Sequence, residues 1–293
     1  MVRQAQVVLI TGASRGFGRA AVHELAARGH RVVATMRNPE RDGPAVVGGY
    51  EQNVSLTPCD VTDRDQTEAA VAFTVERHGH VDALINNAGY GVYGPVEDLT
   101  DAEMHAEFDT NVFGQIRMAQ AVLPHMRAGR HGRIINVSSV SGRLVVPAMG
   151  LYGASKHAIE AISEALRFET GRWGIEVGMI EPGGYATDIV GGMQLVDRIR
   201  HRTSVYQDVV DAQFEAFSAG ISSRPGPRTV GVALADMVEL EQPLPLRWPM
   251  GNDVDEAWDR RDRLTAAQWE AHMRTAPGYW SAFFRHEDGQ EPS

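Results

Sequence analysis

Short apolar runs alternate with amphipathic stretches along the first two thirds of the chain. The runs are rich in β-branched residues and apolar at nearly every position, which is typical of strands that helices cover on both faces. The stretches between them have the length of crossover helices. The pattern therefore predicts an α/β fold, a doubly wound parallel sheet in a three-layer α/β/α arrangement. We expect strands at 7–10, 31–35, 54–57, 83–86, 133–138 and 175–180.

Two helix ends are marked by local signals. Thr100 and Glu103 make a capping box, which predicts a long helix that continues to about Arg127. Gly29 suits the end of the first helix, because glycine adopts the left-handed conformation that often follows a last turn.

The alternation of apolar runs and amphipathic stretches ends after about residue 184. The stretch 185–225 is mixed, and a helical run at 229–240, a strand at 246–248 and a charged tail follow. No clear linker separates this part from the rest, so we interpret 1–293 as a single domain. Within it, 1–184 would form the core, and 185–293 would form a helical lid over the substrate and a C-terminal extension.

The bulk composition narrows the class of protein. Hydrophobic residues make up 43% of the 293 residues, and the net charge is −10, which is typical of a globular protein and argues against nucleic acid or an anionic membrane as the main partner. The single cysteine, Cys59, excludes an internal disulfide and fits a cytoplasmic location. The first apolar run is too short for a secretion signal or a membrane span. No cluster at zinc spacing is present, so we expect no metal site.

The segment TGASRGFG (11–18) follows the first strand directly and opens a helix. Its glycines allow a tight turn and a close approach to a pyrophosphate, whose charge suits a helix N-terminus. A glycine-rich turn alone is weak evidence, but its position after the first strand favours a dinucleotide site. The candidate cofactor contacts in this loop are Gly12, Ser14, Arg15, Gly16, Phe17 and Gly18.

The end of the second strand predicts which nicotinamide cofactor is used. An acidic residue there would bind the ribose 2′-hydroxyl of NAD, but Met36 and Arg37 stand where the strand ends. Arg15 lies in the glycine loop. Two cations and no carboxylate favour the 2′-phosphate of NADP(H), since arginine can grip phosphate in a bidentate fashion. The alternative is that both arginines are solvated loop residues.

Tyr152 and Lys156 lie four residues apart at the start of an Ala-rich helix. At that spacing both side chains are on one face, one turn apart. A nearby ammonium favours the ionised form of a phenol, so the pair could be a tuned proton donor. Taken alone, this spacing is more typical of an ordinary surface pair.

An ordered set of motifs resembles the short-chain dehydrogenase/reductase family in its one-domain Rossmann form. The set covers about residues 5–190, and its serine and tyrosine have the family's spacing. Its members are TGASRGFG (11–18), Asp60–Val61, NNAG (86–89), Asn111, Ser139, YGASK (152–156) and PGGYAT (182–187).

The resemblance implies roles in cofactor binding. Asp60 would contact the adenine amine and Val61 the adenine ring, although Asp60 could also cap the next helix. The residues implied to line the adenosine half are Asn86, Ala88 and Gly89, with Asn87 mainly bracing the sheet. The residues implied to frame the nicotinamide are Pro182, Gly183 and Thr187.

The resemblance also implies four catalytic roles. Tyr152 would be the general acid in reduction and the base in oxidation, with its pKa lowered by Lys156 and by the oxidised cofactor. Lys156 would also hold the nicotinamide ribose, and Ser139 would orient the substrate oxygen. Asn111 would steady a water that relays protons to Lys156; alternatively it is a buried asparagine satisfied by the backbone.

We therefore expect an NADP(H)-preferring oxidoreductase that acts on a ketone or secondary alcohol. Its substrate would be an apolar small molecule, as in the similar hydroxysteroid and retinol-type members of the family. Alternatives are a catalytically silent cofactor sensor on the same fold and a sugar-nucleotide epimerase or dehydratase. A homodimer could form through helices 101–127 and 152–171. Candidate lid and rim residues are Met193, Tyr206, Phe214 and Phe217, with 140–149 and 90–93.

Overall fold

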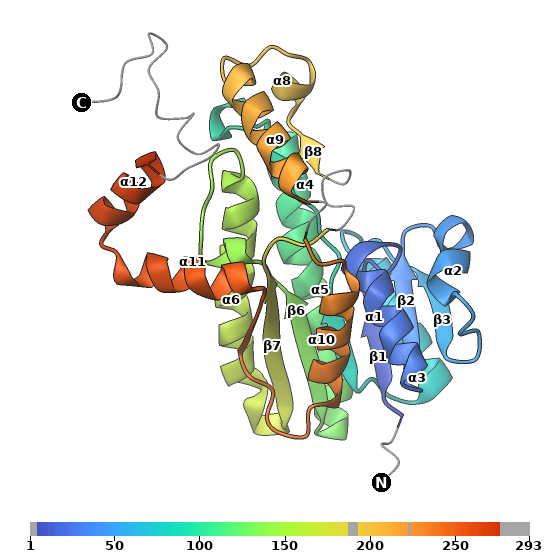
Figure 1. The fold of residues 1–293 in the computed structure, drawn as a ribbon. Coiled ribbons are helices and arrows are strands. Elements are labelled where there is room, and N and C mark those ends of the chain that lie inside the picture. Colours follow the sequence, from blue (N-terminus) through green and yellow to red (C-terminus); the bar gives the residue numbers. More distant parts are fainter. Residues whose placement is uncertain (1–4, 187–192, 222–223, 276–293) are drawn as a thin grey trace.

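The computed structural model describes residues 5–186, 193–221 and 224–275. Seven strands in these residues form one sheet in the order β3-β2-β1-β4-β6-β7-β9, and every neighbouring pair is parallel (Figure 1). The predicted doubly wound α/β fold is confirmed. The strands are β1 (Val7–Ile10), β2 (Arg31–Met36), β3 (Val54–Pro58), β4 (Ala83–Asn86), β6 (Gly132–Val137), β7 (Ile175–Pro182) and β9 (Arg247–Met250). A separate parallel pair joins β5 (Val92–Tyr93) to β8 (Gln194–Leu195).

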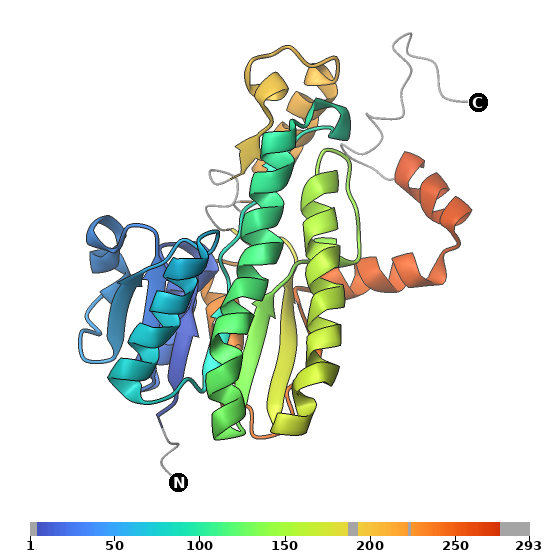
Figure 2. The same cartoon turned by 180° about the vertical axis from the view of Figure 1, so that it is seen from behind.

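Helices cover both faces of the sheet. Helices α1 and α10 lie on the face seen in Figure 1, and α3, α5 and α6 lie on the face seen in Figure 2. The helices are α1 (Gly16–Ala27), α2 (Pro39–Val47), α3 (Arg64–His78), α4 (Asp101–Phe108), α5 (Gly114–Gly129), α6 (Gly150–Thr170), α8 (Asp197–Arg200), α9 (Gln207–Ile221), α10 (Arg228–Glu239), α11 (Asn252–Arg263) and α12 (Ala266–Thr275).

The apolar run of β1 supplies both hydrophobic cores. Val8 and Ile10 belong to the core under α1 and α10, whereas Leu9 belongs to the core under α3 and α5. Successive side chains of a strand point to opposite faces, so a strand between two helical layers needs an apolar residue at every position. This is the physical reason for the continuous run in the sequence.

Helix α10 and strand β9 belong to the core of the fold. A Cβ atom on Gly231 of α10 would lie 2.7 Å from the backbone carbon of Ala20, so glycine lets α10 approach α1 closely. Strand β9 pairs with β7 and ends the sheet. Within the predicted lid and C-terminal extension (185–293), α10 and β9 are therefore parts of the layered sheet structure and do not form a lid.

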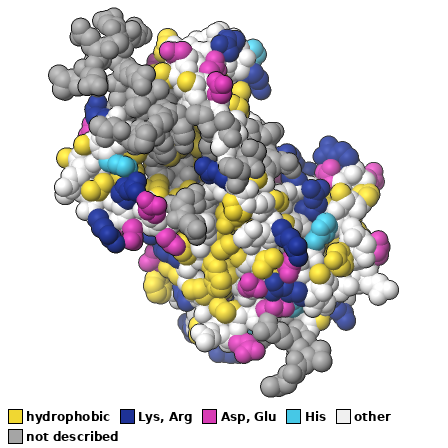
Figure 3. All heavy atoms as spheres, viewed as in Figure 1, with side chains coloured by type: hydrophobic (Ala, Val, Ile, Leu, Met, Phe, Trp, Pro, Cys, Tyr) yellow, Lys and Arg dark blue, Asp and Glu magenta, His cyan; other side chains and the backbone are white. Residues whose placement is uncertain are grey.

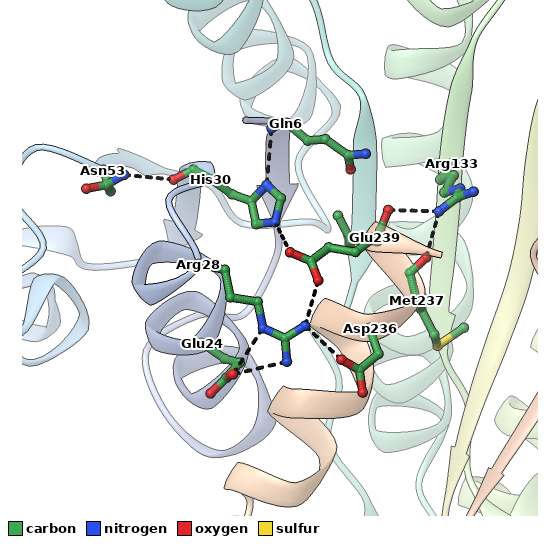
Figure 4. A network of polar contacts seen from close by, with 10 residues as sticks. Gln6, Glu24, Arg28, His30, Asn53, Arg133, Asp236, Met237 and Glu239 are labelled. Carbon is green, nitrogen blue, oxygen red and sulfur yellow. Dashed lines mark hydrogen bonds and ion pairs between the residues drawn. The ribbon is translucent and has the colours of Figure 1, made fainter. Parts of the chain in front are cut away.

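A polar network holds α10 against α1 beside the start of β2 (Figure 4). Arg28 binds Glu24 at 3.1 Å, Asp236 at 2.7 Å and Glu239 at 2.9 Å. Glu239 also contacts Nε2 of His30 at 2.9 Å. The network lies at the amino ends of the parallel strands, on the side opposite their carboxyl ends.

The predicted long helix is interrupted. The capping box of Thr100 and Glu103 is present, but the α-helical pattern stops at Phe108 and resumes at Gly114. A π-helical turn, Asp109–Phe113, separates α4 from α5. Such turns insert an extra residue into a helix and are frequent at functional sites. This turn contains Asn111.

The segments that follow β7 lie partly above the carboxyl ends of the strands, where α8, α9 and β8 are seen in Figure 1. Helix α11 reaches the loop after β6: Nε1 of Trp258 donates to the carbonyl of Val140 at 3.3 Å, and Arg143 pairs with Asp262 at 2.7 Å. Acidic and basic side chains are interspersed over the face seen in Figure 3. None of the helices in the described ranges is long and apolar enough to cross a membrane.

Candidate active site

The glycine loop lies at the carboxyl end of β1 and leads into α1. Gly12 and Gly16 have φ values of 66° and 57°, which glycine adopts readily. A Cβ atom on Gly18 would lie 2.5 Å from Nδ2 of Asn87 and from the carbonyl of Gly12. Arg15, the N-cap residue of α1, makes no side-chain capping bond, so the helix N-terminus keeps donors for an anion. This compact cradle fits a pyrophosphate.

The rest of the loop lines the cradle. Ser14 is partly buried, and the ring of Phe17 packs edge-on against Tyr185 with centroids 5.7 Å apart. Thr11 ties the loop to the segment after β4, because its Oγ1 accepts from the backbone N–H groups of Asn87 and Ala88 at 3.0 Å each. Sequence analysis did not single out Thr11, although it directly precedes Gly12.

Two exposed arginines, Arg15 in the glycine loop and Arg37 directly after β2, define a rim of the site beside β2. Within the described ranges, neither the Arg15 nor the Arg37 guanidinium makes a hydrogen bond or ion pair, whereas Arg41 binds Asp42 at 2.8 Å. The pKa of Asp42 is lowered mainly by that bond and further by the charges of Arg15 and Arg37. Met36 is only 3% exposed and packs in the core, so its side chain does not face the rim.

The segment after β3 forms a tight turn. Oδ1 of Asp60 accepts from the N–H and the hydroxyl of Thr62, at 3.0 and 2.8 Å. The idea that Asp60 caps the next helix is wrong, because Asp63 is the N-cap residue of α3. Val61 is buried, and a Cβ atom on Gly114 would lie 2.6 Å from its Cγ2. The Val61 side chain therefore packs against α5.

The NNAG segment after β4 divides into two parts. Asn86 is 1% exposed and donates to the carbonyl of Gln115 at 3.2 Å and to Oδ1 of Asn136 at 2.9 Å, so its side chain braces β4 and β6 internally. Asn87 instead braces the glycine loop. The alternation along β4 turns the Asn86 side chain inward, so any part of Asn86 that lines the adenosine half of a cofactor would be its backbone.

Gly89 lies next to the catalytic candidates. A Cβ atom there would lie 3.0 Å from Oδ1 of Asn111 and 3.9 Å from Nζ of Lys156. Glycine therefore leaves open the space beside these two groups, where the loop after β4 meets α6.

Ser139, Tyr152 and Lys156 come together at the carboxyl end of β6. Ser139 follows this strand, and its Oγ accepts from the N–H of Ser141 at 3.1 Å. Nζ of Lys156 donates to the carbonyl of Val137 at 2.9 Å and lies 5.6 Å from the centre of the Tyr152 ring. All three catalytic candidates are buried. The pair on α6 is therefore no ordinary surface pair.

Burial dominates the electrostatics of this group. Desolvation raises the pKa of Tyr152 to about 12, and a hydrogen bond with Ser139 lowers it by less. Desolvation lowers the pKa of Lys156 to about 8. The expected lowering of the Tyr152 pKa by Lys156 is not seen, because the loss of hydration outweighs the other effects. The phenol is therefore protonated at neutral pH.

Asn111 is fully buried in the π-helical turn. Its Nδ2 donates to the carbonyl of Tyr90 at 2.8 Å and to Oγ of Ser155 at 3.1 Å, and its Oδ1 accepts from the N–H of Tyr90 at 3.0 Å. The side chain thus joins the loop after β4 to α6. Glu107, one helical turn earlier, is also fully buried, and sequence analysis missed it. The signal was its four-residue spacing from Asn111.

The end of β7 closes the site. Pro182 is the last residue of this strand, and the N–H of Gly183 donates to the carbonyl of Met250 at 2.9 Å. Thr187 lies outside the described residues.

An apolar cluster lies beside the segment that follows β4. It contains three of the predicted lid residues, Met193, Tyr206 and Phe214, and the ring of Phe214 packs edge-on against Tyr93 at 5.3 Å. The side chain of Phe217 is outside the described set. Across the described ranges, no group of three His, Cys, Asp or Glu side chains could hold a metal ion.

Comparisons with known proteins agree with this geometry. Residues 6–195 match the short chain dehydrogenase family. The chain is 35% identical to the 3-ketodihydrosphingosine reductase of Bacteroides thetaiotaomicron, over 85% of this chain and 88% of that protein. It is also 32% identical to a short-chain dehydrogenase structure from Streptomyces avermitilis, with a TM-score of 0.80, covering 94% of this chain and 99% of that one.

Two similar structures hold different cofactors. The structure of ElxO with NADP bound has a TM-score of 0.72 at 22% identity, covering 86% of this chain and 100% of that one. A structure from Burkholderia phymatum in complex with NAD has a TM-score of 0.76 at 25% identity, covering 93% and 96%. The motifs, the sheet and the relatives agree, and the chain belongs to the short-chain dehydrogenase/reductase family of oxidoreductases.

Proposed function

We propose that this chain is an NADP(H)-preferring oxidoreductase that interconverts a ketone and a secondary alcohol. The observation that carries the proposal is the buried group of Ser139, Tyr152 and Lys156 beside a glycine cradle that fits a pyrophosphate. Reduction of a carbonyl needs a proton donor and a group that orients the oxygen, and this group contains both.

Each residue has a chemical role in the proposal. Tyr152 donates its phenolic proton to the carbonyl oxygen, and in oxidation it takes a proton back. Ser139 donates a hydrogen bond to the same oxygen and so orients the substrate. Lys156 would hold the nicotinamide ribose through its ammonium, and the cradle of Gly12, Gly16 and Gly18 would hold the pyrophosphate. When bound, the nicotinamide supplies or accepts the hydride.

The preference for NADP(H) rests on the rim beside β2. Arg15 and Arg37 are exposed and have no competing hydrogen bond or ion pair among the described residues. Their guanidinium groups are thus available for a 2′-phosphate. The similar structures hold NADP in one case and NAD in another, so the preference is argued from these two arginines alone.

The substrate class rests on the apolar cluster above the site. Met193 and the ring of Tyr93 are buried in this cluster, and Tyr206 and Phe214 pack against it, next to the segment after β4. An apolar lining on this side of the site would favour an apolar ketone or alcohol. A relative named 3-ketodihydrosphingosine reductase supports a ketone with a long hydrocarbon chain as the first compound to test.

We further propose that the chain acts as a homodimer in the cytoplasm. Phe113 at the end of the π-helical turn and Phe168 on α6 are 47% and 76% exposed, on the helices that we expected to pair. Large exposed aromatic side chains are favoured at protein interfaces. The one cysteine of the chain, Cys59, is buried and free, which suits a reducing compartment.

The test is the consumption of NADPH with a panel of apolar ketones, including 3-keto lipids and steroids, and of NADP with the matching alcohols. The matched control is Tyr152→Phe, which removes only the phenolic hydroxyl and should lower kcat by about 100-fold or more. Binding of NADPH without turnover of any compound would favour the silent sensor. A Tyr152→Phe variant that keeps more than about a tenth of kcat would show that another group is the acid.

A further inference from the structure

Glu107 is a fully buried carboxyl group beside the catalytic residues, and the chemistry proposed above does not use it. It lies in the last turn of α4, one turn before Asn111. Its Oε1 accepts from the N–H of Val92 and from Nδ2 of Asn111, at 3.4 Å each. Its Oε2 is also buried and has no hydrogen-bond partner in the part of the chain that the structure describes.

The surroundings of Glu107 contain two residues of the proposed active site, Lys156 and Tyr152. A Cβ atom on Gly89 would lie 3.0 Å from Oδ1 of Asn111, which Glu107 binds, and 3.9 Å from Nζ of Lys156. Lys156 acts on Glu107 as a positive charge, and Glu107 in turn favours the protonated forms of Lys156 and Tyr152. Burial raises the pKa of Glu107 to about 8, close to that of Lys156. The titratable groups that interact with the charge of Glu107 are Lys156 and Tyr152 on α6 and Tyr90 after β4. Tyr90 is also acted on by the charges of Arg37, Asp109 and Glu103.

A purely structural role would not need a carboxyl group at this position. Glutamine has a similar shape and could accept the same hydrogen bonds from Val92 and Asn111. It would avoid the cost of desolvating a charge, which a buried carboxylate with one unpaired oxygen must meet. A group that can ionise is useful here only if its charge acts on its neighbours.

We propose that Glu107 is a positioning residue for the reaction: one oxygen holds Asn111 and Val92, and its negative charge keeps Tyr152 and Lys156 protonated in alkaline solution. The inference rests on the proposed function, because it assumes that Tyr152 is the proton donor. As the pH rises, Glu107 ionises, and the new charge opposes the loss of a proton from either neighbour. The enzyme therefore keeps its activity in ketone reduction at higher pH than it would without the charge of Glu107.

The first test is the pH profile of kcat for ketone reduction in the wild type and in Glu107→Gln. In Glu107→Gln the negative charge is absent, so Tyr152 and Lys156 lose protons more easily and the alkaline limb of the profile should move to lower pH by about 1 unit. The acidic part of the profile should be the same in both proteins. Glu107→Asp restores a carboxylate and should move the limb back. Glu68→Gln on α3 is the control: its side chain is 61% exposed, and the limb should not move. A loss by the same factor at every pH would overturn the proposal.

The second test needs no activity. The folded-state pKa of Glu107 is raised from 4.5 to about 8, so the unfolded chain binds fewer protons between these values. Stability therefore falls as the pH rises through this window, and Glu107→Gln should remove that part of the fall. Melting temperatures of the two proteins should diverge from pH 5 to about pH 8, to the disadvantage of the wild type. Parallel curves would overturn the inference, whereas a wild type that reduces no ketone would overturn the proposed function instead.

Discussion

Arg37→Ala should lower kcat/KM for NADPH and leave that for NADH nearly unchanged. The side chain is exposed and makes no hydrogen bond or ion pair within the described ranges, so its removal breaks no such bond there and should not disturb the fold. A charge-assisted bond to phosphate contributes about 1.5–3 kcal/mol, and solvent exposure reduces this to about 1–2 kcal/mol. The expected loss with NADPH is therefore about 5–30-fold.

The assay is steady-state kinetics with both cofactors at a fixed concentration of substrate. Arg41→Ala is the matched control, because Arg41 lies on the same rim but already binds Asp42 at 2.8 Å, and it should change neither cofactor's kcat/KM by more than about twofold. Replacing Met36 by Asp would be a poor test, since Met36 is 3% exposed and a carboxylate there would be buried. Equal losses with NADPH and NADH, or tighter binding of NADH by the wild type, would refute the reasoning.

Two further changes test the cofactor site. Lys156→Met removes the ammonium but keeps most of the buried stem, so the chain should fold while the affinity for NADPH, measured by titration calorimetry, falls by about 10–100-fold; unchanged affinity would argue against the ribose contact. Gly18→Ala places a Cβ 2.5 Å from Nδ2 of Asn87 and should lower the free energy of unfolding by about 1–3 kcal/mol and weaken NADPH binding. The control Gly129→Ala on α5 meets no atom within 4 Å, so a similar loss of stability in both variants would contradict the steric account.

Much of the core was predictable because its causes are local or periodic. A strand between two helical layers must be apolar at every position, so β1 and its neighbours are visible in the sequence within one or two residues at each end. The capping box of Thr100 and Glu103 joins residues three apart, and the structure contains it. The glycine loop was predictable for the same reason, since backbone geometry limits which residues can make such a turn.

Some features of the candidate site depended on long-range packing. Asn86 and Asn87 are adjacent and identical, yet one side chain braces the sheet interior and the other braces the glycine loop. Which one faces inward depends on the register of β4 against β6. The interruption of the predicted long helix also could not be predicted from the sequence. No proline marks the position of the π-helical turn that contains Asn111.

The sequence by itself determined the fold class and the order of the motifs, because both follow from patterns along the chain, and its resemblance to the short-chain dehydrogenase/reductase family implied Ser139, Tyr152 and Lys156 as a group. Only the tertiary structure decided how strongly these groups are buried, and therefore that desolvation raises the pKa of Tyr152 rather than lowering it. Only the structure brought Glu107 beside Lys156, since the two residues lie on different helices. Burial and through-space charge depend on segments far apart in the sequence, and no local pattern contains them.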